Sequence, residues 1–261
     1  MTLPLALTLF GLGLIGAFVS GLVGVGGAIV LIPLLLYVPP LLSAGTLDIK
    51  MVAGLTMTQV LAAAVVGAWS HGREANVHHA LAWTGGPAMA AGALVGAVGS
   101  HYVSGRALLA VFGLMATLAL PLMFVTPAAP AGEADEAAVP FSRAAAIAYP
   151  GVIGLMSGLV GAGGAFLLVP VLIGLMGIPV RLSIGTSLAM VGMAAVAGFV
   201  GKAVTGQVPL WAAAILVLGS LVGALLGGRV SHRLPVAALR FVLVALIAVV
   251  MVRIWIDVFR G

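Results

Sequence analysis

Two glycine-rich turns are the part of this chain best suited to bind a ligand. The first, Gly24–Gly27, reads Gly-Val-Gly-Gly, and the second, Gly161–Gly164, reads Gly-Ala-Gly-Gly. A helix that restarts after each turn would point its free N–H groups and its positive dipole end back at the glycines. Such an arrangement binds oxyanions without a cationic side chain. The sequence therefore predicts two anion-binding turns, formed by Gly24, Gly26, Gly27, Ala28, Gly161, Gly163, Gly164 and Ala165.

Hydroxyl side chains in the next apolar run of each half are candidates to complete these turns. Thr56 and Thr58 follow the first turn, together with the amide of Gln59, and Ser183, Thr186 and Ser187 follow the second. Their O–H groups would add hydrogen-bond donors for an anion without adding charge.

A second interpretation is that glycines only let helices approach closely, as small residues do in membranes. We expect this packing role for one set of glycines in particular: Gly92, Gly96, Gly219 and Gly223. A nucleotide-binding loop is excluded for the two turns, because no strand pattern precedes them and no Lys-Ser or Lys-Thr pair follows them.

The charged residues exclude most other chemistry. The chain has no cysteine, and its six acidic residues lie in a linker or at the ends of apolar runs. A pump that depends on carboxylates inside the membrane is therefore disfavoured. No nucleophile, ligand cluster or acid–base pair is predicted in the interior, so we expect no enzyme, no metal site and no cofactor. No basic cluster indicates nucleic-acid binding. His71 and Lys202 follow Gly67 and Gly198 at matching places in the two halves, which is compatible with a vestibule that attracts anions, but for Lys202 we expect extension to the membrane interface.

The composition places the turns inside a membrane. Hydrophobic residues make up 63% and charged residues 7% of the 261 positions, whereas soluble domains carry about 25% charged residues. The strict alternation of barrel strands is absent, so we predict an all-α polytopic membrane protein. It should contain eight apolar helical segments, which span about 5–37, 50–70, 79–100, 107–125, 145–176, 182–202, 210–229 and 236–256.

Two of these segments, 5–37 and 145–176, are too long for a single crossing. A helix over 5–37 would reach about 50 Å, and the core of a bilayer is ~30 Å thick. The glycine turns fall inside these two segments and are predicted to break them. Because broken backbone at membrane depth persists only where protein or a water-filled cavity satisfies its polar groups, both turns should line a cavity.

The two halves of the chain resemble each other. Ser20–Pro33 and Ser157–Pro170 are identical at ten of fourteen positions. We predict a first transmembrane repeat at 1–125, an acidic proline-containing linker at 126–143 and a second repeat at 144–261. Internal repeats are typical of secondary transporters. The repeats are parallel if the broken segments cross fully and inverted if these segments turn back, and the sequence is compatible with both.

These signatures resemble the sulfite exporter TauE/SafE family, also called toluene-sulfonate uptake permeases. The likeness covers nearly the whole chain and is carried by Gly21-Leu-Val-Gly-Val-Gly-Gly-Ala-Ile-Val-Leu-Ile-Pro33, its counterpart Gly158–Pro170, Ile184-Gly-Thr-Ser-Leu188 and Leu221-Val-Gly-Ala-Leu225. The resemblance implies a multi-pass protein of the bacterial inner membrane that moves sulfite, sulfonates or other small organic anions, with the glycine turns as signature loops. Because Ala53–Thr58 departs from the pattern that Ile184–Leu188 follows, Thr56 and Thr58 rank below Thr186 and Ser187.

The sequence thus predicts a membrane transporter for a small oxyanion, bound between two repeats at the paired helix breaks. The expected partners are this anion and the lipid bilayer, and the chain is compatible with a homo-oligomer. The alternative is a non-transporting scaffold or assembly protein whose glycines serve only helix packing. Replacement of Gly26 or Gly163 by Ala separates the two, because only a transporter should lose its flux.

Overall fold

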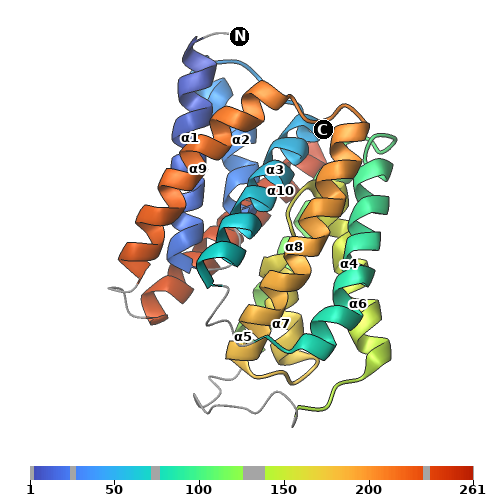
Figure 1. The fold of residues 1–261 in the computed structure, drawn as a ribbon. Coiled ribbons are helices and arrows are strands. Elements are labelled where there is room, and N and C mark those ends of the chain that lie inside the picture. Colours follow the sequence, from blue (N-terminus) through green and yellow to red (C-terminus); the bar gives the residue numbers. More distant parts are fainter. Residues whose placement is uncertain (1–2, 24–27, 72–76, 126–138, 232–235, 261) are drawn as a thin grey trace.

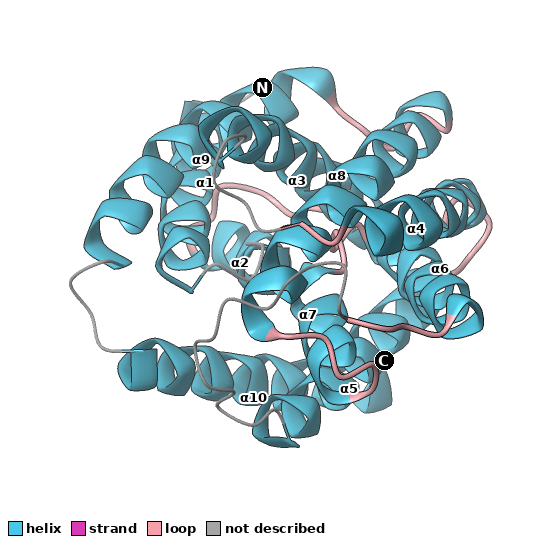
Figure 2. Ribbon diagram, turned by 60° about the horizontal axis from the view of Figure 1, so that its bottom comes forward, coloured by secondary structure: helices cyan, strands magenta, loops and turns pink. Residues whose placement is uncertain are grey.

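The computed structural model describes residues 3–23, 28–71, 77–125, 139–231 and 236–260, and these residues form ten α-helices and no strand (Figures 1 and 2). The all-helical prediction is therefore confirmed for the described residues. In chain order the helices are α1 (Leu3–Val23), α2 (Ala28–Leu41), α3 (Ile49–His71), α4 (His79–Gly99), α5 (Gly105–Val125), α6 (Arg143–Val160), α7 (Ala165–Gly174), α8 (Val180–Val204), α9 (Leu210–Ser231) and α10 (Val236–Arg260).

Five helices within the described residues are long and apolar enough to cross a membrane, namely α4, α6, α8 and most of α5 and α9. Large apolar side chains on these helices face outward, for example Trp83, which is 73% exposed, and Leu225, which is 61% exposed. Soluble monomers rarely expose large apolar patches, but lipid solvates such surfaces. The helix lengths and this outer surface are those of a multi-pass membrane protein.

Each of the two over-long segments holds two helices. The segment at 5–37 contains α1 and the first part of α2, and the turn Gly24–Gly27 between them lies outside the described residues. In the segment at 145–176, α6 ends at Val160, α7 begins at Ala165, and Gly161–Gly164 connect them. Eight predicted segments thus correspond to ten helices.

Most helices run between two opposite ends of the molecule, which we call the Lys202 end and the His78 end. Lys202, near the end of α8, donates a hydrogen bond of 2.6 Å to the hydroxyl of Ser100, just after α4. At the other end, the backbone N–H of His78, just before α4, donates to the hydroxyl of Thr186 in α8 at 2.9 Å. Helices α4 and α8 therefore both run from the His78 end to the Lys202 end, which is uppermost in Figure 1.

The starting points of α3 and α6 follow from two further contacts. The Nζ atom of Lys50, at the start of α3, donates to the carbonyl oxygen of His101 just past α4 at 2.6 Å. Helix α3 therefore begins at the Lys202 end and runs antiparallel to α4 (Figure 1). The rings of His78 and Phe141 pack edge to face, 5.2 Å apart. Because Phe141 directly precedes α6, this helix begins at the His78 end.

The chain turns back on itself between α6 and α7. A Cβ atom on Gly161 would lie 2.0 Å from the carbonyl oxygen of Ala53, near the start of α3. A Cβ atom on Gly163 would lie 2.6 Å from a methyl of Val60, about two helical turns further along α3 and away from the Lys202 end. After α7, a short connection leads to α8, which starts at the His78 end. Helices α6 and α7 thus form a hairpin that enters and leaves at the His78 end.

Helix α1 starts at the opposite end from α6. It lies parallel to α9, because Phe10 packs against Gly219 and, two turns later, Phe18 packs against Gly227. Helix α9 follows Gln207, whose side-chain oxygen accepts a hydrogen bond from Lys202 at 3.1 Å. Both α9 and α1 therefore begin at the Lys202 end, and both descend in Figure 1.

Helix α2 returns along α1. A Cβ atom on Gly16 of α1 would lie 2.8 Å from the side chain of Leu31 in α2, and α2 ends shortly before α3 starts at the Lys202 end. The first helix pair of the N-terminal half therefore enters and leaves at the Lys202 end, whereas α6 and α7 enter and leave at the His78 end. The structure accordingly has two helix pairs that point in opposite directions.

Glycines form the tightest helix contacts. A Cβ atom on Gly92 or Gly96 of α4 would lie 2.3 or 2.1 Å from carbonyl oxygens of α6, and one on Gly219 or Gly223 of α9 would lie 2.2 or 2.1 Å from those of α1. A real Cβ atom does not fit at such distances, so only glycine is tolerated at these four positions. The packing role predicted for these four glycines is confirmed.

Candidate functional site

The Gly161–Gly164 turn is built from backbone that favours glycine. Gly161, Gly163 and Gly164 have φ angles of 80°, 69° and 75°, a region in which side chains with a Cβ are strained. The N–H groups of Gly161 and Ala162 both donate to the carbonyl oxygen of Ser157, at 2.7 and 3.1 Å, which closes the last turn of α6. All four turn residues are buried.

The start of α7 presents unpaired donors at this turn. The N–H groups of Leu167 and Leu168 donate to the carbonyl oxygen of Gly164, at 3.1 and 2.9 Å. The N–H groups of Gly163, Gly164, Ala165 and Phe166 have no backbone acceptor among the described residues. These groups carry the positive end of the α7 dipole, and Gly163, Gly164 and Phe166 are buried, with Ala165 half-buried between them.

Ser157 adds a hydroxyl to the same place. Its side chain is fully buried, and its Oγ atom has no hydrogen-bond partner in the described part of the chain. Its Cβ atom lies 3.3 Å from the position that a Cβ would take on Gly164. A buried hydroxyl without a partner costs free energy, so this group is available to donate to a bound molecule.

Helix α3 of the N-terminal half forms the opposite wall of the turn. Ala53 and Val60 contact Gly161 and Gly163, as described above. Next to Val60 lies Gln59, whose side chain is only 2% exposed and whose Oε1 atom has no partner among the described residues. The turn is therefore enclosed by both halves of the chain.

The predicted hydroxyl residues are buried or half-buried, and most of their protons are directed elsewhere; Ser183, for example, donates to the carbonyl oxygen of Ile178 at 3.1 Å. Thr56, Thr58 and Ser187 donate to carbonyl groups of the preceding turn of their own helices, at 2.9, 2.8 and 2.8 Å. Thr186 accepts the N–H of His78, which places it at the His78 end. Thr56, Thr58 and Ser187 therefore offer only lone pairs in this conformation, and the unpaired donors at the turn come from the backbone and Ser157.

Sequence reasoning missed Ser157, although a signal for it exists. Ser157 is one of the ten positions that the two halves share, where it matches Ser20. Among the residues predicted for the first half, Ala28 is buried at the start of α2. Gly24, Gly26 and Gly27 lie outside the described residues.

Lys202 lies in the interior, so the prediction that it extends to the membrane interface is wrong. Its side chain is fully buried. The Nζ atom donates to Ser100 Oγ at 2.6 Å, to the carbonyl oxygen of Leu159 at 3.0 Å and to Gln207 Oε1 at 3.1 Å. The three acceptors come from three separate parts of the chain, and they hold the side chain between helices and away from lipid.

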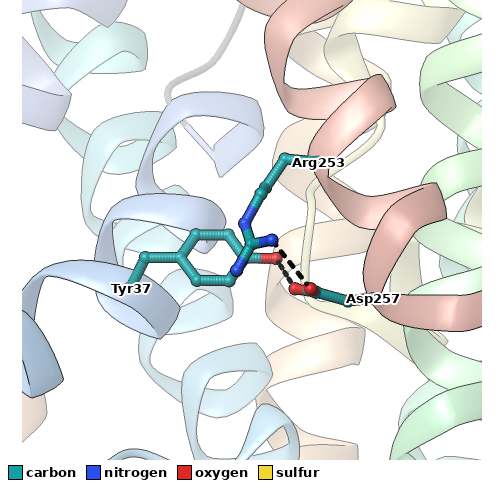
Figure 3. Close-up of polar contacts among 3 residues, drawn as sticks. All are labelled: Tyr37, Arg253 and Asp257. Carbon is teal, nitrogen blue, oxygen red and sulfur yellow. Dashed lines mark hydrogen bonds and ion pairs between the residues drawn. The ribbon is translucent and has the colours of Figure 1, made fainter. Parts of the chain in front are cut away.

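A second polar cluster joins α2 to α10. The hydroxyl of Tyr37 donates to Asp257 Oδ2, and Arg253 Nη1 lies 3.1 Å from Asp257 Oδ1 (Figure 3). The Arg253 guanidinium also stacks over the Tyr37 ring, 4.8 Å from its centre. As predicted, Asp257 lies near a helix end, and it is paired. The cluster fixes the end of α2, and it is separate from the glycine turn.

These features define a class of protein: a multi-pass helical membrane protein with a helix hairpin whose turn, Gly161–Gly164, is buried. Within the described residues, no group of three His, Asp or Glu side chains is close enough to hold a metal ion.

The chain belongs to the sulfite exporter TauE/SafE family, whose model matches residues 9–254. It is 27% identical over 248 residues to the probable membrane transporter protein YunE of Bacillus subtilis (strain 168), covering 85% of this chain and 87% of the relative. It is 31% identical over 194 residues to a probable membrane transporter protein of Xylella fastidiosa (strain 9a5c), covering 74% of this chain and 72% of the relative. No solved structure matches. The chain is accordingly a membrane transporter of this family.

Proposed function

We propose that the chain transports a small oxyanion, such as sulfite or an organosulfonate, across the bacterial inner membrane and binds it at the glycine turns. The observation that carries this proposal is the buried start of α7, where unpaired N–H groups meet the unpartnered hydroxyl of Ser157. These donors have no acidic side chain beside them among the described residues, an arrangement that suits an anion and disfavours a cation. Sulfur is suggested by the family name alone.

The helix contacts support two inverted repeats, which we propose are α1–α5 and α6–α10. Helix α1 packs chiefly against α9, and α6 packs chiefly against α4, so that the first helix of each half contacts the fourth element of the other half. Helices α3 and α8 contact each other, as do α5 and α10. The main contacts are thus preserved when the two halves are exchanged. In transporters of this kind the substrate lies between the repeats, next to broken helices.

Flux and binding measurements in liposomes test the proposal. We expect purified protein to move sulfite or methanesulfonate, and oxyanions to raise its unfolding temperature. Gly163→Ala should abolish flux, because the new Cβ would lie 2.6 Å from Val60 and would strain a backbone with φ of 69°. Gly99→Ala is the matched control, since a Cβ there meets nothing within 4 Å.

Two results would contradict the proposal. One is a wild-type protein that moves no oxyanion and is stabilised by none. The other is a folded Gly163→Ala protein with full flux, which would favour a scaffold whose glycines serve packing alone.

A further inference from the structure

Lys202 is a buried basic side chain with no anionic partner among the described residues. Its side chain has no exposed surface, and the three groups that contact its Nζ atom are a hydroxyl, an amide oxygen and a backbone carbonyl. A buried charge is normally paired or coordinates a ligand. The proposed binding turn does not use Lys202 directly, so its position needs a separate explanation.

The three groups around Lys202 Nζ can accept all three protons of an ammonium group. The carbonyl oxygen of Leu159 and the Oε1 atom of Gln207 can only accept. The hydroxyl of Ser100 has two acceptors for its own proton, the carbonyl oxygen of Ala97 at 2.6 Å and Gln207 Oε1 at 3.0 Å, so it too accepts from Lys202. All three ammonium protons therefore have an acceptor.

Three helix C-termini meet at this ammonium group. Leu159 is in the last turn of α6, Ser100 is the C-cap of α4, and Lys202 itself is in the last turn of α8. Each C-terminus carries roughly half a negative charge. Without a cation, the Lys202 end of this bundle would present a concentrated negative potential inside the membrane.

This potential would act on the Gly161–Gly164 turn, because the turn and Lys202 both lie at the C-terminal end of α6. Leu159 precedes Gly161 by only two residues, so their Cα atoms are at most about 8 Å apart. An anion at the start of α7 would experience the field of the three C-termini as repulsion, unless a positive charge cancels it.

We propose that Lys202 is a positioning residue for anion passage: it cancels the negative ends of α4, α6 and α8 and so keeps the Lys202 end open to anions. The inference rests on the proposed anion transport. It predicts an effect that scales with the charge of the anion, since the lost interaction is electrostatic. At a separation of about 10 Å and an effective dielectric constant of about 20, the expected change in affinity is about tenfold per negative charge.

The test compares a monovalent with a divalent anion, methanesulfonate and sulfite above neutral pH, as ligands and as transported ions. Lys202→Met should weaken methanesulfonate binding about tenfold and sulfite binding about a hundredfold. Lys202→Arg retains a permanent charge and should keep the wild-type ratio of the two affinities. Lys50→Met is the control, because Lys50 lies at the same end but its hydrogen bond to His101 is exposed.

A second variant covers the case in which Lys202→Met fails to fold. Gln207→Glu leaves the packing nearly unchanged and places a negative charge 3.1 Å from Nζ, so it should reproduce the charge-dependent loss. Equal losses for both anions in these variants, or no loss, would overturn the inference while wild-type flux still supports anion transport. Absence of wild-type flux would instead refute the proposed function.

Discussion

At the scale of single residues, the buried side-chain hydroxyl of Ser157 is unusual in its hydrogen bonding. Most buried hydroxyls have a partner, and its Oγ atom has none among the described residues. Its backbone oxygen already closes the end of α6 by accepting two N–H groups. The residue thus stabilises the helix end through its backbone and leaves its side chain free for a ligand.

Ser157→Ala should weaken oxyanion binding about tenfold to a hundredfold, because a hydrogen bond to a charged group contributes about 1.5–3 kcal/mol. The variant removes no internal hydrogen bond, so its unfolding temperature without anion should not fall. Anion titrations followed by thermal unfolding measure both quantities. Ser220→Ala is a matched control, since Ser220 is also a buried hydroxyl without a described partner but lies in α9, against α1. If the two variants bind the anion with equal affinity, the hydroxyl of Ser157 does not contribute to anion binding.

At the scale of elements, the glycine contacts decide which helices move together. Gly154 and Gly158 of α6 bring its backbone against Met89 and Ala93 of α4. Helix α7 has no comparable glycine contact, since a Cβ on Gly174 would reach only a side chain, at 4.0 Å. We therefore expect α6 to stay fixed on α4 during transport, and α7 to be the more mobile arm of its hairpin.

Gly158→Ala tests the tight contact between α4 and α6. Its new Cβ would lie 2.2 Å from the carbonyl oxygen of Ala93, which is backbone and cannot move aside. We expect a loss of about 1–3 kcal/mol in the free energy of unfolding, the usual effect of overpacking. Thermal unfolding in detergent measures the loss.

Gly11→Ala in α1 is the control and should leave stability unchanged or slightly higher, because a Cβ there meets nothing within 4 Å. A Gly158→Ala protein as stable as the wild type would show that the two helices can separate.

The sequence predicts the elements better than their directions. Apolar runs and glycine positions are local signals, and they place α6, α7 and the turn between them. Whether α7 continues across the membrane or returns depends on contacts with Ala53 and Val60, more than a hundred residues away. The burial of Lys202 has the same origin. Its position near a helix end favours the interface, and only the convergence of α4, α6 and α8 encloses it.

At the scale of the whole molecule, the opposed helix pairs give each end of the protein its own hairpin. The pair α1–α2 enters from the Lys202 end and the pair α6–α7 from the His78 end. The Gly161–Gly164 turn follows Leu159, which contacts Lys202, so an anion bound at this turn lies toward the end opposite the one from which its hairpin enters. Access could then alternate by a movement of one repeat against the other, as in other transporters with inverted repeats.

The opposed hairpins predict which connections share a side of the membrane. If α6–α7 turns back, the α7–α8 connection lies on the side opposite the α2–α3 connection; if every segment crosses fully, the two lie on the same side.

The chain has no cysteine, so single introduced cysteines can report on which side of the membrane each connection lies. Leu42→Cys and Leu175→Cys suit the purpose, because their side chains are 62% and 56% exposed. An impermeant maleimide added to one side of oriented vesicles should label only one of the two, and Ser142→Cys, which precedes α6, should react together with Leu175→Cys. Labelling of Leu42→Cys and Leu175→Cys from the same side would exclude the hairpin and, with it, the inverted repeats.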